Sequence, residues 1–154
     1  MASSGYSLVL CSWPGAAEEI RALRQQVLVS EMGLPGNVLN VPADTGAYHV
    51  LVHDSGGRAV GAACMQPDGQ IDYVLVLRPW RCKTVGGALL AYLHHIAQAR
   101  NLAHIWTVVP TVARRFFEKN RFTPCEDNVL TAFMSGLKYV RPVRKPGSNT
   151  SVTH

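Results

Sequence analysis

Residues 74–90 read VLVLRPWRCKTVGGALL, an apolar strand, a short basic loop with a proline, and the start of a helix. Two adjacent glycines, Gly86 and Gly87, lie in the first turn of that helix. The first turn of a helix has unpaired backbone N–H groups and the positive end of the helix dipole, which suits phosphate groups. Glycine lets a ligand approach the backbone closely, and Arg81 and Lys83 add positive charge. The stretch therefore predicts an anion site, with close helix–strand packing as the alternative explanation of the glycines.

The segments around this stretch predict an α/β fold. Strand-like patterns occupy residues 6–11, 47–53, 58–65, 71–77 and 104–109. Helical spacing of apolar residues occupies 15–31 and 84–100, and 110–120 reads as a short helix. The turn at 54–57 joins two strands as an antiparallel hairpin, whereas the helix 84–100 predicts a right-handed crossover between parallel strands. We expect a single-domain, mixed, mostly antiparallel twisted sheet with a central parallel β-α-β crossover and helices on both faces.

The C-terminal part of the chain is less clear from its pattern. Residues 122–140 contain an apolar stretch that fits a helix or a strand equally well. From residue 141 onward the chain is basic and polar and lacks periodicity. We therefore expect a domain over residues 1–140 and a flexible tail over 141–154.

Composition excludes several classes of protein. The chain has 154 residues, room for one domain, and its 47% hydrophobic and 16% charged residues argue against disorder. No apolar run reaches the roughly 20 residues of a membrane helix, and the first residues lack the features of a signal peptide. The four cysteines form no CxxC pair, so we expect free thiols in a reducing compartment and a cytoplasmic protein.

The net charge of +5 favours an anionic partner such as a phosphorylated cofactor, an acidic substrate or nucleic acid, although it also serves solubility alone. Nucleic acid is disfavoured because the basic residues form no stripe and the aromatic residues lie in apolar runs. A metal site is also disfavoured, since the adjacent His94 and His95 point in different directions from a helix. We expect no nucleic-acid or membrane partner and no metal.

Residues 74–90 resemble motif A of the GNAT superfamily of acyl-CoA-dependent N-acetyltransferases. The loop of that motif usually reads Arg/Gln-x-x-Gly-x-Gly/Ala; here Arg81 and Gly86 match, and Thr84 stands where the first glycine is expected. Residues 110–122 resemble the downstream family pattern Asn-x-x-Ala-x-x-Phe-Tyr-x-Lys-x-Gly-Phe, and residues 23–49 resemble the ElaA-like branch. The resemblance implies acetyl-CoA as cosubstrate, a small-molecule or protein amine as acceptor, and a monomer or homodimer.

Three departures follow in the downstream pattern: Pro110 replaces Asn, Phe117 replaces Tyr, and Arg121 replaces Gly. In many relatives the tyrosine protonates the departing CoA thiolate, and a positioned general acid contributes about 10²- to 10⁴-fold. A thiolate with a pKa of roughly 8.5 is still a tolerable leaving group at neutral pH. The sequence therefore predicts a slower enzyme or another proton donor. The alternative is a catalytically impaired CoA-binding sensor or partner-binding module.

The resemblance also implies the site residues. Those implied to bind the cofactor are Val74, Leu75, Val76, Arg81, Cys82, Lys83, Thr84, Val85, Gly86, Gly87 and Phe117. The backbone N–H of Val76 is the candidate donor to the thioester oxygen. For the general base we rank Asp72 first, because it shares strand parity with Val74 and Val76, then Glu31, with a water chain as a further possibility. Tyr73 lies on the opposite parity and is expected to pack.

Overall fold

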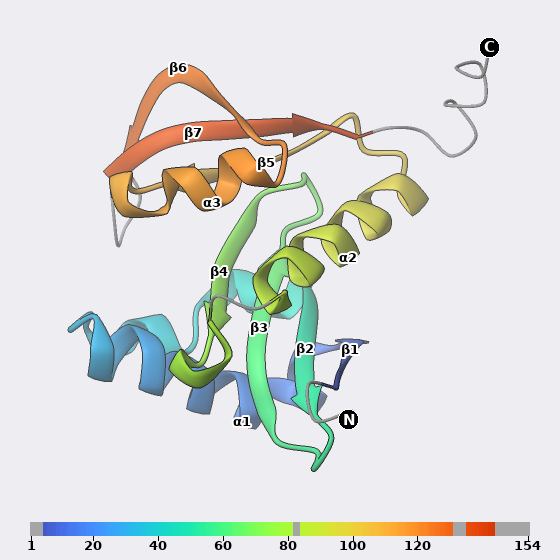
Figure 1. The fold of residues 1–154 in the computed structure, drawn as a ribbon, viewed down its shortest axis with the longest axis vertical. Coiled ribbons are helices and arrows are strands. Elements are labelled where there is room, and N and C mark those ends of the chain that lie inside the picture. Colours follow the sequence, from blue (N-terminus) through green and yellow to red (C-terminus); the bar gives the residue numbers. More distant parts are fainter. Residues whose placement is uncertain (1–4, 82–83, 131–134, 144–154) are drawn as a thin grey trace.

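The computed structural model describes residues 5–81, 84–130 and 135–143. Two antiparallel sheets organise the chain (Figure 1). The first contains, in spatial order, β1 (Tyr6–Cys11), β2 (Tyr48–Asp54), β3 (Ala59–Met65) and β4 (Ile71–Val76). The second contains β5 (His104–Val109), β7 (Ser135–Pro142) and β6 (Thr123–Leu130) in that order. The C-terminal stretch is thus a strand pair, which the sequence pattern could not distinguish from a helix.

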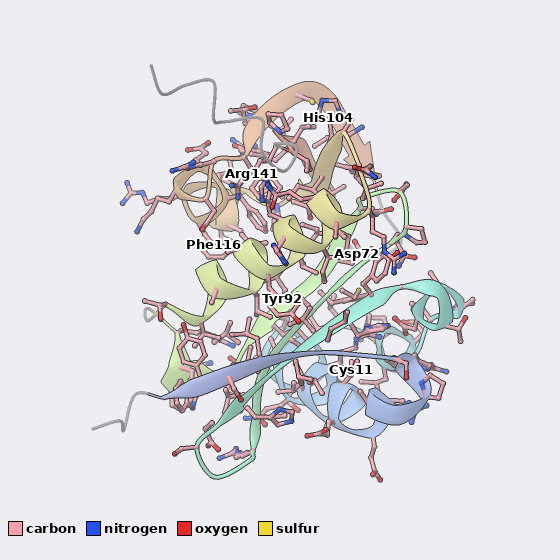
Figure 2. The ribbon with its side chains drawn as sticks, turned by 90° about the vertical axis from the view of Figure 1, so that its right-hand side faces the viewer. Cys11, Asp72, Tyr92, His104, Phe116 and Arg141 are labelled. Atoms are coloured by element: carbon pink, nitrogen blue, oxygen red, sulfur yellow. The ribbon has the colours of Figure 1, made fainter. Side chains whose placement is uncertain are left out.

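Helices cover both faces of the first sheet. The helix α1 (Trp13–Arg24) begins with a proline in its first turn and continues as a π-helix, η2 (Gln25–Glu31). Short 3₁₀ turns follow at η3 (Gly36–Leu39) and η4 (Pro42–Gly46). The long helix α2 (Val85–Ala99) lies on the other side of the strands from α1 (Figure 2). Both helices turn an apolar stripe to the sheet, and these stripes form the core with the strands.

The two sheets meet at β4 and β5. After β4 come η5 (Arg78–Trp80) and α2, and after β5 come η6 (Thr111–Ala113) and α3 (Arg114–Lys119). Within the described residues one parallel bridge, from Gln70 to Trp106, joins the segments that begin these strands. Beyond that bridge β4 and β5 belong to different sheets and diverge (Figure 1). The predicted fold class is confirmed. Among the described residues, the parallel pairing is confined to this bridge, and from there β4 and β5 separate to form a wedge-shaped opening.

A β-bulge interrupts β4 inside this wedge. The flanking cross-strand pairs are Asp72 with Cys64 and Leu75 with Ala62. Tyr73 and Val74 therefore stand opposite the single residue Ala63, which is the two-against-one arrangement of a bulge. Tyr73 has a φ of 53°, in the left-handed region that a residue with a bulky side chain rarely adopts. Because of the bulge, residues before and after it exchange faces of the sheet.

Further predictions can be compared with the described part of the chain. Cys11, Cys64 and Cys125 are free thiols, as expected, whereas Cys82 lies outside the described residues. The strand β7 runs through Pro142, two residues beyond the predicted domain boundary, and the next N–H, of Val143, donates to the carbonyl of Ala103. Residues 144–154 of the predicted tail lie outside the described residues. No described helix combines the length and apolar character that crossing a membrane requires.

Candidate active site

A cleft of about 440 Å³ opens where β4 and β5 diverge. Its walls come from β4, β5, η2 and the segment that carries η6 and α3. Its lining residues are Val27, Leu28, Met32, Leu34, Gln70, Asp72, Tyr73, Val74, Leu75, Thr107, Val108, Pro110, Val112, Ala113, Phe116 and Phe117. Asp72 on β4 and Phe116 on α3 both line this cleft, and Figure 2 shows the two residues well apart. Of the predicted site residues, the structure thus brings Asp72, Val74, Leu75 and Phe117 together.

Asp72 lines this cleft as a half-buried carboxylate. Burial raises its pKa, and a weak hydrogen bond from Gln70 Nε2, 3.4 Å from Oδ1, works in the opposite direction. The parity argument that selected Asp72 is wrong, because the bulge places it on the same face as Leu75 and opposite to Val76. It reaches the cleft nonetheless. A carboxylate with a raised pKa accepts protons more readily near neutral pH, which suits a general base.

Glu31 occupies a different environment at the end of η2. Its carboxylate accepts hydrogen bonds from Arg81 at 2.8 and 3.1 Å and from Arg78 at 2.8 Å. Hydrogen bonding to Arg81 is the main reason why the pKa of Glu31 is lowered. Both carboxylate oxygens are engaged by guanidinium groups, and Glu31 does not line the cleft. The geometry therefore argues against the prediction that Glu31 is a base.

Arg81 links the end of β4 to this ion cluster. Its Nε donates to the carbonyl oxygen of Val76 at 2.7 Å, while its terminal nitrogens hold Glu31. Its side chain is 37% exposed, so an incoming anion could exchange with the Glu31 carboxylate. The two following residues of the predicted loop, Cys82 and Lys83, lie outside the described residues.

The start of α2 contains the remaining residues of the predicted loop. Thr84 is the N-cap residue, with an ordinary φ of −92°, and its hydroxyl lies 2.6 Å from the hydroxyl of Tyr6. Replacement of the family glycine by threonine therefore causes no backbone strain. The side chain of Val85 is fully buried, so this residue can offer a ligand its backbone alone.

The two glycines of α2 allow α3 to pack closely against it. A Cβ on Gly86 would lie 3.0 Å from the ring of Phe116, and one on Gly87 would lie 3.3 Å from Asn120 Oδ1. Close packing was the alternative explanation for these glycines, although the partner is a helix rather than a strand. The two explanations are compatible, because this contact places α3 beside the N-terminus of α2, where backbone N–H groups are available for an anion.

Phe117 contributes an aromatic wall to the cleft. It is 7% exposed and packs edge-on against Phe116, with ring centroids 5.0 Å apart, and against Phe122 at 5.5 Å. Its ring carries no proton donor. In the described residues, the phenol that lines the cleft belongs to Tyr73, whose pKa burial raises to about 12.

A buried polar network supports the bulge from behind, and sequence reasoning missed it. Arg24 and Asp44 are 1% and 0% exposed and form a bidentate ion pair with distances of 2.8 and 2.9 Å. The guanidinium of Arg24 also stacks on the ring of Tyr73 at 4.2 Å. His49 Nε2 lies 2.8 Å from the carbonyl oxygen of Asp44 and must carry the proton; burial lowers the pKa of this histidine. A cation within the apolar stripe of α1 was the signal available in the sequence.

Asp44 and His49 also lie within 4.8 Å of the thiol of Cys64, a grouping with the elements of a metal site. However, both Asp44 oxygens accept hydrogen bonds from Arg24, whose charge would repel a metal cation. Burial raises the pKa of Cys64 to about 12, so its thiol stays protonated and is a poor metal ligand. We interpret the group as a structural network.

Comparison with known proteins defines the class. A family model described as the acetyltransferase (GNAT) domain matches residues 45–124, just over half of the chain. The chain therefore belongs to the GNAT acetyltransferase family, whose members transfer acyl groups from acyl-CoA. No curated protein sequence shows a significant match.

Solved structures agree on the fold. A Lactobacillus plantarum protein provisionally described as an N-acetyltransferase superposes with a TM-score of 0.80 at 17% identity, covering 91% of this chain and 99% of that one. Escherichia coli ElaA gives 0.75 at 15% identity, covering 89% and 99%. Tetrahymena GCN5 gives 0.72 at 13% identity, covering 90% and 96%. At these identities the likeness concerns the fold alone.

Proposed function

We propose that the protein transfers an acetyl group from acetyl-CoA to a primary amine by direct attack of the amine on the thioester. The observation that carries this proposal is the cleft between β4 and β5, which extends from α3, beside the start of α2, to the half-buried carboxylate of Asp72. A thioester arm can lie along β4 with its phosphates at the start of α2. The acceptor then approaches from the Asp72 end.

The described residues support a division of roles. Burial keeps the pKa of Asp72 raised, so its carboxylate can take a proton from the incoming ammonium group. The backbone N–H of Val76 is the proposed donor to the thioester oxygen as negative charge develops there. As the C–S bond breaks, the thiolate can leave without a positioned acid, because its pKa of roughly 8.5 lies close to neutral pH.

A combined binding and turnover experiment tests the proposal. Acetyl-CoA at 100 times its dissociation constant should raise the free energy of unfolding by about 2.7 kcal/mol. Thiol release with a panel of primary amines should then show turnover. Absence of stabilisation by acetyl-CoA contradicts the proposal at the first step.

Arg81→Ala should weaken acetyl-CoA binding by about 1.5–3 kcal/mol, through loss of a charged hydrogen bond to phosphate. Arg78→Ala is the matched control, since Arg78 holds the same Glu31 carboxylate but is 76% exposed and does not anchor the end of β4. Calorimetric titration with acetyl-CoA should show the large loss in Arg81→Ala alone. Equal losses of acetyl-CoA affinity in the two variants would show that Arg81 contributes only its positive charge and makes no specific contact.

A second candidate function is a CoA-binding module with impaired catalysis, and the buried Phe117 favours it. Phe117→Tyr adds a hydroxyl to a ring that already lines the cleft, so turnover should rise about tenfold, at the low end of general-acid gains. The gain should fade as pH approaches the phenol pKa of about 10. Steady-state thiol release measures this effect. Unchanged or lower turnover would show that Phe117 serves packing.

A further inference from the structure

The two ends of the cleft differ, and the difference bears on the acceptor. The end next to α3 lies beside the start of α2, because Phe116 packs on Gly86. Under the proposed function the phosphates and the thioester arm occupy this end. The opposite end is bounded by η2 and the turn after it, which contribute Val27, Leu28 and Met32. That end is left for the amine.

The η2 end is apolar both in its wall and at its rim. Val27 and Leu28 form the buried wall, at 6% and 5% exposed. At the rim of this end Met32 is 56% exposed; Val112, from η6 on the α3 side of the cleft, is 94% exposed. These are two of the four large apolar side chains exposed in the described part of the chain, and both line this cleft. Apolar groups kept in water beside a cavity indicate a surface that a ligand covers.

The backbone of this wall is also unusual. η2 is a seven-residue π-helix, a conformation that is rare and frequently found at functional sites. It is held at one end by the hydrogen bonds from Arg78 and Arg81 to Glu31. The turn that follows places Leu34 in the same lining as Val27 and Leu28. The wall is therefore a fixed feature of the fold and not a loose loop.

Among the described residues that line the cleft, ionisable charge is confined to one position. Among the described lining residues, Asp72 is the side chain that carries charge at neutral pH, since burial raises the pKa of Tyr73 to about 12. Arg24 and Asp44 behind Tyr73 neutralise each other. One carboxylate can pair with one ammonium group. A second cationic or anionic group on the acceptor would lie against the apolar wall without a partner, which is unfavourable because the charge loses its hydration without compensation.

Resting on the proposed function, we propose that the acceptor is a small primary monoamine with an uncharged apolar body. Its ammonium group pairs with Asp72, and its body lies between the wall formed by Val27 and Leu28 and the rim formed by Met32. In the reaction an N–C bond forms and the thioester C–S bond breaks. The ammonium loses two protons; one ends on the CoA thiol and the other passes through Asp72 to solvent, giving an amide and free CoA.

Thiol release at saturating acetyl-CoA tests this inference with four probes: n-hexylamine, 2-phenylethylamine, spermidine and ethanolamine. The two apolar monoamines should have kcat/KM values about 100-fold higher than the other two, because discrimination through apolar contact reaches about 10- to 200-fold per group. Met32→Gln preserves the size of the rim residue and should raise the KM for n-hexylamine about tenfold, with acetyl-CoA affinity unchanged. Val9→Thr, at an exposed position on β1, is the matched control and should leave both values unchanged.

The outcomes separate this inference from the proposed function. Failure to bind acetyl-CoA contradicts the proposed function itself. Binding of acetyl-CoA together with equal or better turnover of spermidine or ethanolamine overturns the inference and leaves the proposed function standing. Binding without transfer to either apolar amine also overturns it. A preference for hexanoyl-CoA over acetyl-CoA that Met32→Gln abolishes would assign the apolar end to the acyl chain and overturn it as well.

Discussion

Replacing Asp72 by asparagine should lower kcat for acetyl transfer by about 100-fold or more, while acetyl-CoA still binds. The variant keeps the shape of the side chain and removes its ability to accept a proton, and a positioned general base contributes about 10²- to 10⁴-fold. In the wild type, kcat/KM should rise with pH through a pKa above the usual range for an aspartate, because burial raises the pKa of Asp72. Asp72→Asn should lack this limb of the pH profile.

The Asp72→Asn substitution should lower activity without lowering the stability of the fold. The folded-state pKa of Asp72 is raised, so the stability that it contributes is fully present below its unfolded pKa of about 3.9 and is lost as pH rises through the folded value. Above that folded-state value the wild type therefore bears the cost of an ionised, half-buried carboxylate. Asp72→Asn removes this cost, and its thermal midpoint at pH 7 should equal or exceed that of the wild type. A carboxylate with a purely structural role would give a lower midpoint.

Two further variants complete the test. Glu18→Gln removes an exposed carboxylate from α1 and should change neither activity nor stability appreciably. Glu31→Gln removes the rival base; kcat should persist, because the Glu31 carboxylate is occupied by Arg78 and Arg81. If Glu31→Gln abolishes turnover and Asp72→Asn does not, the assignment of the base is reversed.

The fold could be predicted because its decisive features are local. The strand, basic loop and double glycine of residues 74–90 form a consecutive pattern, and the structure has β4, η5 and α2 in that order. The pattern of 122–140 could not be resolved. A short apolar run fits a helix or a strand alone, and the choice here depends on pairing of β7 with both β5 and β6.

The site was less predictable because it depends on tertiary contacts, which the spacing of residues in the sequence does not reveal. Strand parity assumes an unbroken alternation, so it could not foresee the bulge at Tyr73 that moves Asp72 to the other face from Val76. The loop motif gave Arg81 a role toward phosphate but could not show that Glu31, 50 residues away in the chain, holds its guanidinium. Both cases depend on residues brought together by tertiary structure.

Asp44→Asn should lower the free energy of unfolding by about 3–5 kcal/mol, the largest stability effect that we expect for a single substitution in this chain. The carboxylate accepts two hydrogen bonds from Arg24 and a third from the backbone N–H of Val41 at 2.8 Å, so the variant leaves a buried guanidinium without its counter-charge. At roughly 2–4 °C per kcal/mol for a domain of this size, the thermal midpoint should fall by about 10 °C.

A control variant and a double variant test whether the buried pair of Arg24 and Asp44 acts through its charges. Glu19→Gln breaks the exposed contact between Glu19 and His53 and should cost less than about 1 kcal/mol. The pair Arg24→Met with Asp44→Leu replaces both buried charges by apolar groups, and should recover much of the stability that Asp44→Asn loses, since removing a whole buried pair is often close to neutral. Arg24 also stacks on Tyr73, so the recovered double variant should still show lower kcat than the wild type if the guanidinium holds the bulge in place. If the double variant recovers both stability and kcat, the role of Arg24 is limited to pairing with Asp44. If Asp44→Asn lowers the free energy of unfolding by less than about 1 kcal/mol, the ion-pair argument itself is contradicted.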